Sequence, residues 1–313
     1  MKGFSTSGAK AYNTSLKPTR YVCASRRLRS RLSSALYVRA MLKQRIDILD
    51  AYAAAFRDLV NNRVWGKNEH PYASLRLNSE ADWSFVCVAM DVVGDASLAI
   101  RNFLKFGLDG PSRYEDAGER YLRLYGLLSA AYIQQQAVLK LYSLMNCPSP
   151  KQIQSMFHNL EVRILRHQLA SHSLDFLAPG SNSKQAFVPV RIGLAGFSCE
   201  VTENRGDRSR TVKLDVALDE HTKAVIEVLD KTFEKSTRTL FKGQAKKLGE
   251  WKQKLDDLRF ERDGNVIIRG GTGDSKHELR IVFVEPDKSK RITSRSTENR
   301  GQITISSNMS GKL

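Results

Sequence analysis

The sequence predicts an α+β protein in which an antiparallel helical bundle is followed by a small α+β domain. Two periodicities support this fold class: apolar residues recur every three or four positions from about residue 26 to 179, and every second position in short segments after residue 180. The first spacing is typical of helices with one buried face, and the second of strands. We expect domains at 26–179 and 180–290, with a basic mobile arm at 1–25 and a polar tail at 291–313.

Four helices are predicted in the first domain, at residues 26–62, 79–107, 121–144 and from 150 through the segment 166–172. Ser79 is placed to cap the first turn of the second helix, which is expected to stop near Gly107. Pro150 stands at a tolerated first-turn position of the fourth helix. Short links between these helices favour an antiparallel bundle.

The second domain is predicted to combine strands with a long charged helix. Strands are expected at residues 188–194 and 212–216, as a hairpin at 266–268 and 279–284 across the glycine-rich turn 270–274, and at 303–305 in the tail. The polar stretch 203–210 is predicted to be a turn or loop. The helical stretch runs from about residue 220 to 258 and is expected to bend or break near Gly243 and Gly249.

The chain is strongly basic, with 50 Lys and Arg against 33 Asp and Glu and a formal net charge of +17. Asp47 is the first acidic residue, so the arm and the first helix carry a concentrated positive field. Such a field attracts polyanions by releasing their counterions. Nucleic acid is therefore the leading expected partner, and an anionic membrane surface is the second. A basic soluble protein without such a partner remains the alternative.

The cysteines and the apolar runs bear on location and cofactors. Cys23, Cys87, Cys147 and Cys199 form no Cys-x-x-Cys pair and have no His partner at ligand spacing, so we expect reduced thiols, no metal and no cofactor. No apolar run approaches the ~20 residues that span a bilayer, and the first 20 residues lack the apolar centre of a secretory signal. We expect a cytoplasmic protein, with a transit peptide in residues 1–31 as the alternative.

The segment Arg166–His172, which reads RHQLASH, is the candidate catalytic site. Arginine stays cationic and presents a fork of donors to phosphate, while histidine titrates near neutral pH and can move a proton. At ~100° per residue, the fourth helix has one apolar stripe at Ile153, Phe157, Leu160 and Ile164 and a second at Val162, Leu165 and Leu169. Arg166 and His172 flank the second stripe. A bundle needs one buried face, so the second stripe predicts a partner surface, and a two-fold partner would bring two Arg/His pairs to one cleft.

This segment resembles the Arg-x4-6-His signature of HEPN ribonucleases, helical proteins whose active site is shared between two protomers. The match is Arg166, His167 at the polar position, and His172 after five intervening residues, and the family's bundle would cover about residues 28–178. The resemblance implies a metal-independent endoribonuclease with a composite site in a homodimer. His172 would handle a proton, Arg166 would stabilise charge on the phosphate, and His167 would contact substrate. Toxin or antiphage biology, with an antitoxin or regulatory partner, follows from the resemblance alone.

Further side chains and a second function remain open. Asp91, Asp95, Tyr121 and Tyr125, from the second and third helices, are candidates to support the cleft. The two aspartates are one turn apart and either pair with Arg166 or form ordinary surface ion pairs. The alternative function is a non-catalytic nucleic-acid-binding or scaffold protein. In that protein, the Arg166–His172 segment is a solvated helix end, and His167 is a satisfied core imidazole.

Overall fold

The computed structural model describes residues 34–112, 116–178, 180, 182–270, 277–283 and 303–308. Met1–Tyr37 and Val38–Leu313 form two compact units. Of the first unit, the structure describes only the start of helix α1. The predicted basic arm at 1–25 and the alternative transit peptide therefore lie outside the described residues, and so do most of the predicted 270–274 turn and most of the polar tail.

The unit Val38–Leu313 combines helices with small antiparallel sheets, which confirms the predicted α+β class. Helix α1 (Ser34–Val64) begins in the first unit and continues into this one. The helices that follow are α2 (Pro71–Ser74), α3 (Glu80–Phe106), α4 (Ala117–Leu144), α5 (Pro150–His158), α6 (Glu161–Arg166), the π-helical turn η1 (His167–Ser171), α7 (Leu214–Leu240) and α8 (Ala245–Arg262). The strands and one 3-10 turn are β1 (Phe176–Leu177), β2 (Lys184–Gln185), β3 (Phe187–Ala195), β4 (Ser198–Glu203), η2 (Asn204–Gly206), β5 (Arg208–Lys213), β6 (Val266–Gly270), β7 (His277–Phe283) and β8 (Ile303–Asn308). The described strands pair in the orders β1–β2, β3–β4–β5 and β6–β7–β8.

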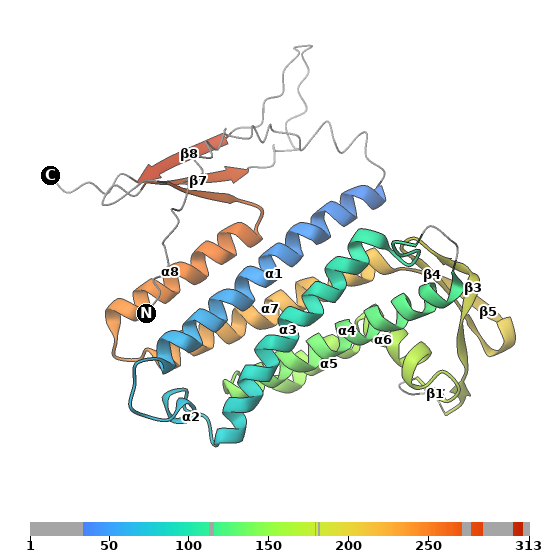
Figure 1. The fold of residues 1–313 in the computed structure, drawn as a ribbon, viewed down its shortest axis with the longest axis horizontal. Helices are drawn as coiled ribbons and strands as arrows, with labels where there is room; N and C mark the ends of the chain where they lie inside the picture. Colours follow the sequence, from blue (N-terminus) through green and yellow to red (C-terminus); the bar gives the residue numbers. More distant parts are fainter. Residues whose placement is uncertain are drawn as a thin grey trace, which may run out of the picture. The chain divides into compact units, whose positions relative to one another are not determined.

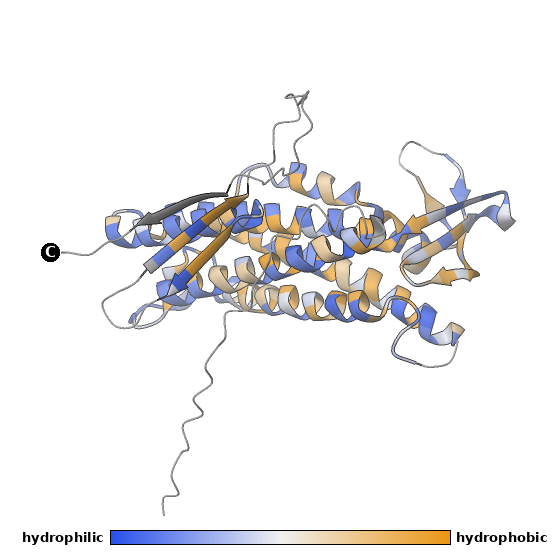
Figure 2. Cartoon of the chain, turned by 90° about the horizontal axis from the view of Figure 1, so that it is seen from above, coloured by the Kyte–Doolittle hydropathy of each residue, from blue (hydrophilic) through white to orange (hydrophobic). Residues whose placement is uncertain are grey.

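The long helices α1, α3, α4 and α7 run alongside one another, and the sheet β3–β4–β5 lies at one end of them (Figure 1). Two buried apolar clusters hold them together. The larger one takes residues from α1, α3, α4, α5, α7 and α8, and the other joins α1, α3, α4, α6 and α7 to the sheet. Figure 2 shows hydrophobic and hydrophilic positions alternating around these helices. Because α7 contributes to both clusters, the residues before and after position 180 share their core.

The ends of α3 follow the sequence prediction. The Ser79 hydroxyl accepts a hydrogen bond from the Asp82 amide at 3.2 Å, which is the predicted cap. The helix ends at Gly107, whose φ of +63° favours glycine. A Cβ there would lie 2.6 Å from the carbonyl oxygen of Gly196 in the β3–β4 turn, so the bundle and the sheet approach closely at this point.

Helix α3 is long and apolar enough to cross a membrane, judged by length and composition only, and among the described helices it is the one that meets this test. Its inward residues Val86, Val93 and Ile100 are buried in the two core clusters. Only 39% of its apolar window is buried inside the fold, and Phe85, Val88 and Leu98 are exposed.

The predicted fourth helix is wrong as a single regular helix. It is broken after α5 at Asn159–Leu160, restarts as α6, and widens into the π-helical turn η1 before His172. Two changes of helical phase therefore lie between Ile153 and His172, and a uniform ~100° step no longer assigns faces correctly.

The predicted partner surface on this helix is also wrong. Val162, Leu165 and Leu169, which formed the second apolar stripe, are buried in the cluster that joins α6 to the sheet. They pack within the chain because the sheet and the start of α7 cover this side of the segment, where the sequence argument expected a second protomer.

After position 180 the predictions hold for most strands and fail at one. The hairpin of β6 and β7 and the strand at β8 are confirmed. The strand expected at 212–216 ends at Lys213, and helix α7 begins at Leu214, so an apolar alternation of three residues was too short to distinguish a strand from a helix start. The charged helix breaks at Gly243, with φ of +84°, whereas Gly249 lies inside α8.

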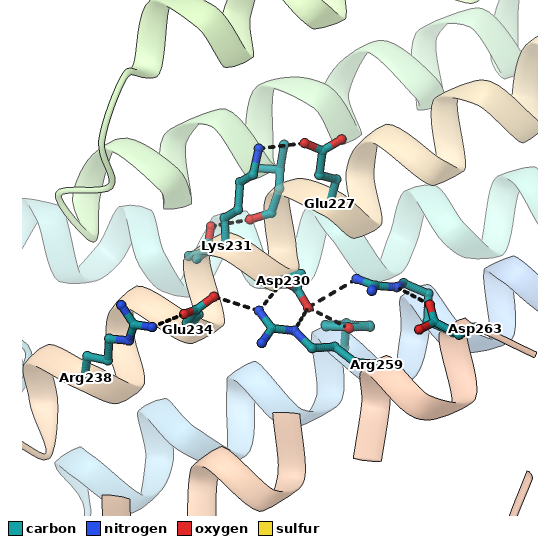
Figure 3. Close-up of polar contacts among 11 residues, drawn as sticks. Glu227, Asp230, Lys231, Glu234, Arg238, Arg259 and Asp263 are labelled. Carbon is teal, nitrogen blue, oxygen red and sulfur yellow. Dashed lines mark hydrogen bonds and ion pairs between the residues drawn. The ribbon is translucent and has the colours of Figure 1, made fainter. Parts of the chain in front are cut away.

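A polar network around the buried Asp230 joins α7, α8 and α1 (Figure 3). The Asp230 carboxylate accepts hydrogen bonds from the Tyr52 hydroxyl at 2.8 Å and from Arg259 Nε and Nη2 at 2.9 and 2.7 Å. Arg259 also donates to Glu234 at 2.7 Å, and Arg262 lies 3.4 Å from Asp230. The hydrogen bond from Arg259 is the main favourable influence that, against burial, holds the pKa of Asp230 below its usual range.

Candidate functional site

A pocket of about 930 Å³ lies between the α5–η1 segment and the sheet β3–β4–β5. Its lining combines imidazoles, cations, carboxylates and an apolar floor. The polar side chains are His158, Asn159, Arg163, His167, Gln168, His172, Asp175, Lys184, Gln185, Glu203, Arg208, Ser209 and Arg210, and the larger apolar ones are Ile164, Phe176, Leu177, Phe187 and Val201.

The π-helical turn brings two of the histidines together. The His172 amide donates to the His167 carbonyl oxygen at 2.8 Å, a hydrogen bond between residues five apart. In a regular α-helix such residues point to different sides, whereas the wider turn sets them one above the other. The two rings are stacked, with centroids 6.1 Å apart and an interplanar angle of 27°. Single π turns inside helices occur often at functional sites.

The imidazoles of the pocket differ in their surroundings. Burial and then the charges of Arg163 and Arg166 lower the pKa of His167 below its usual value. Burial and then Arg163 likewise lower the pKa of His158. Both rings are therefore neutral near pH 7 and keep a lone pair. His172 is more than half exposed, and its Nδ1 lies 3.3 Å from Asp175 Oδ1.

Arg163 is a buried cation, 6% exposed, at the base of the pocket. Its Nη1 donates to Gln135 Oε1 at 3.2 Å, its Nη2 lies 3.2 Å from His158 Nε2, and its guanidinium carbon lies 5.1 Å from the centre of the Tyr132 ring. Burial is the first cause that lowers the pKa of this group. Among the described residues no carboxylate pairs with Arg163, and its buried Nε has no hydrogen-bond partner.

The sheet and the neighbouring strand β2 supply the opposite wall. Arg210 donates to Gln168 Oε1 at 2.8 Å and is also hydrogen-bonded to Glu161, so its charge is paired. Lys184 and Arg208 are exposed at the rim. A polyanion entering the pocket would meet these two cations first.

The structure places only some of the predicted site residues in the pocket. His167 and His172 line the pocket, but Arg166 does not: its guanidinium carbon lies 3.9 Å from the Tyr132 ring centre, over α4. The four residues expected to support the cleft do not line it either. Asp91 pairs with Arg57 at 2.9 Å, and Asp95 is exposed on α3. The ring centroids of Tyr121 and Tyr125 lie 6.1 Å apart, and the Tyr121 hydroxyl donates to the Pro189 carbonyl oxygen at 3.4 Å.

Three contributors were missed by the sequence reasoning: His158, Arg163 and Arg210. His158 and Arg163 lie on opposite sides of the break at Asn159–Leu160, which a regular helical period does not reveal. Within the described residues, no three His, Cys, Asp or Glu side chains are grouped so that they could hold a metal ion. Cys147 and Cys199 are buried free thiols, and burial raises their pKa to about 11 and about 12.

No protein-family model, curated protein or solved structure matches this chain. The likeness to HEPN ribonucleases therefore rests on the segment Arg166–His172 alone.

Proposed function

We propose that the chain is a metal-independent endoribonuclease, that the pocket is its active site, and that the helical part is a HEPN-like bundle. The observation that carries the proposal is the stacked pair His167 and His172 in a pocket whose buried cation, Arg163, has no carboxylate partner among the described residues. Proton transfer and stabilisation of a phosphate charge are the two tasks of RNA cleavage without a metal.

The proposed reaction is a transesterification at phosphorus. The 2′-hydroxyl oxygen forms a bond to the adjacent phosphorus while the bond from phosphorus to the 5′-oxygen breaks. His167, neutral near pH 7, accepts the proton of the 2′-hydroxyl, and His172, held beside Asp175, gives a proton to the leaving 5′-oxygen. Arg163 donates hydrogen bonds to the phosphate oxygens, the role that the family resemblance would give to Arg166.

Dimerisation is a separate proposal. The apolar stripe that suggested a two-fold partner is buried inside the chain. A composite site in a homodimer, a toxin or antiphage role, an antitoxin partner and a cytoplasmic location remain predictions from sequence and resemblance.

Cleavage of RNA by purified protein in EDTA tests the nuclease. We expect His167→Ala and His172→Ala each to slow cleavage by about 100-fold or more, as for the loss of a general acid or base. His70→Ala is the matched control, since His70 is exposed before α2 and does not line the pocket. Equal cleavage by the wild type and His172→Ala, with both folded, would reject the assignment.

A non-catalytic nucleic-acid-binding protein is the second candidate, favoured by the net charge of +17 and the exposed rim cations Lys184 and Arg208. It predicts RNA binding that weakens with salt and no cleavage by the wild type. Lys184→Ala and Arg208→Ala would then weaken binding, while His167→Ala would leave it unchanged.

A further inference from the structure

A line of buried polar side chains connects the pocket to the middle of the helical bundle. Gln134 and Gln135 of α4 and His221 of α7 are all 0% exposed. They stand between the Val93 carbonyl group on α3 and Arg163 in the pocket. A buried polar group is costly unless it is hydrogen-bonded, so a line of this length inside an apolar core requires an explanation.

The hydrogen bonds of this line run in one consistent direction. Gln134 Nε2 donates to the Val93 carbonyl oxygen at 2.9 Å and to Ser97 Oγ at 3.1 Å, which leaves its Oε1 to accept. That oxygen lies 2.9 Å from His221 Nε2, so Nε2 carries the proton. Nδ1 of the neutral ring then accepts from Gln135 Nε2 at 3.2 Å. Burial lowers the pKa of His221 to about 4, which keeps the ring neutral near pH 7.

The last step of the line meets the cation of the pocket. Because the amide nitrogen of Gln135 is committed to His221, its Oε1 faces Arg163 and accepts from Nη1 at 3.2 Å. A flipped amide would place donors against donors at the guanidinium. His221 thus selects the one orientation of Gln135 that accommodates Arg163.

We propose that Gln134, His221 and Gln135 are a positioning relay that holds Arg163 as an unneutralised cation for a phosphate group of the substrate. This inference rests on the proposed function. A neutral amide fixes the guanidinium without cancelling its charge, whereas a carboxylate at the same place would cancel it. An entering phosphate gains charge-assisted hydrogen bonds and relieves a buried charge that lacks a counterion.

Gln135→Glu tests the relay by changing charge with little change of shape. The new carboxylate would pair with Arg163, so we expect inorganic phosphate, titrated by calorimetry, to bind about tenfold or more weakly. The buried cation gains a counterion, but His221 Nδ1 loses the amide donor of Gln135, so circular dichroism must show that the variant is folded before its affinity is compared. Gln168→Glu is the matched control: it adds the same charge to the same pocket, but beside Arg210, which already contacts Glu161. An equal loss in both variants would overturn the relay, because net charge alone would then explain it.

Substitutions of His221 test the far end of the relay. His221→Gln keeps one donor and one acceptor, and His221→Leu removes both. We expect the Leu variant to lose phosphate affinity and kcat on RNA, and the Gln variant to recover a substantial part of both. Circular dichroism establishes that each protein is folded. A folded Leu variant that binds phosphate as the wild type does would overturn the relay, and if this variant does not fold, Gln135→Glu decides.

The two proposals fail in different ways. A wild type that does not cut RNA, but binds phosphate in a manner that Gln135→Glu weakens, removes the nuclease and keeps the relay. Cleavage and phosphate binding that are both unchanged in Gln135→Glu remove the relay and keep the nuclease. A wild type that binds neither phosphate nor pyrophosphate removes the relay.

Discussion

The guanidinium carbon of Arg166 lies 3.9 Å from the centre of the Tyr132 ring, and this contact turns the Arg166 charge toward α4 and away from the pocket. The guanidinium carbon of Arg163 lies 5.1 Å from the same ring centre, and the His167 ring, nearly perpendicular to it, has its centroid 6.2 Å away. The Tyr132 ring therefore contacts Arg163, Arg166 and His167, which lie within five consecutive residues. After burial and the charge of Arg163, the charge of Arg166 contributes to the lowered pKa of His167, which lines the pocket.

Tyr132→Leu should lower stability and activity together. The variant loses the aromatic face under two guanidinium groups, so we expect the free energy of unfolding to fall by about 1–2 kcal/mol. RNA cleavage should slow as well, because Arg163 and His167 lose a common support. Urea denaturation and single-turnover cleavage measure the two effects. Tyr132→Phe keeps the ring and should resemble the wild type; if it matched Tyr132→Leu instead, the hydroxyl group and not the ring face would be the important contact.

The sequence predicts most helices and strands because they carry local signals, such as the Ser79 cap or the alternation in β3. The site depends on two irregularities that a regular period conceals. The break at Asn159–Leu160 and the π turn change the helical phase, so His167 and His172 converge although a uniform helix separates them.

Arg163 was missed for a different reason. Its partner Gln135 lies 28 positions before it, and His221 lies 86 positions after Gln135. Only the tertiary fold brings these groups together, and neither glutamine carries a local sign of chemistry. An arginine on the helix side that packs inward is a weak sequence signal, because arginine is seldom fully buried.

Leu165→Ala should destabilise the fold and leave the association state unchanged. Leu165 is 0% exposed in the cluster beneath the sheet, so truncation should lower the free energy of unfolding by about 3 kcal/mol. Leu174→Ala, at a side chain that is 86% exposed, is the control and should change stability little. Light scattering would give the mass in both cases. Loss of a dimer in Leu165→Ala without loss of stability would restore the stripe as a partner surface.

The buried His221 should make stability fall in acid. Its pKa in the fold is about 4, below the usual 6.5, so its contribution is fully present above pH 6.5 and is lost as the pH falls toward 4. Linkage sets the size of the loss at roughly 3 kcal/mol. His158 and His167 shift in the same direction, so the comparison with His221→Gln isolates this residue. Urea denaturation at several pH values from 7 to 4 gives the free energy of unfolding as a function of pH. This free energy should fall less steeply with decreasing pH in the variant than in the wild type, and equal dependence on pH would contradict the assignment.

Asp230→Asn should destabilise the junction of α7, α8 and α1 far more than the loss of a surface pair does. Asp230 is buried and bonded to Tyr52 and Arg259, so removing its charge leaves the Arg259 guanidinium with Glu234 as its described counterion. We expect a loss of about 3 kcal/mol in the free energy of unfolding, as for a broken buried ion pair. Glu227→Gln, which breaks the exposed 2.6 Å pair with Lys231 on the same helix (Figure 3), should lose less than about 0.5 kcal/mol. Equal losses in the two variants would mean that water reaches Asp230 and solvates it as it does a surface carboxylate.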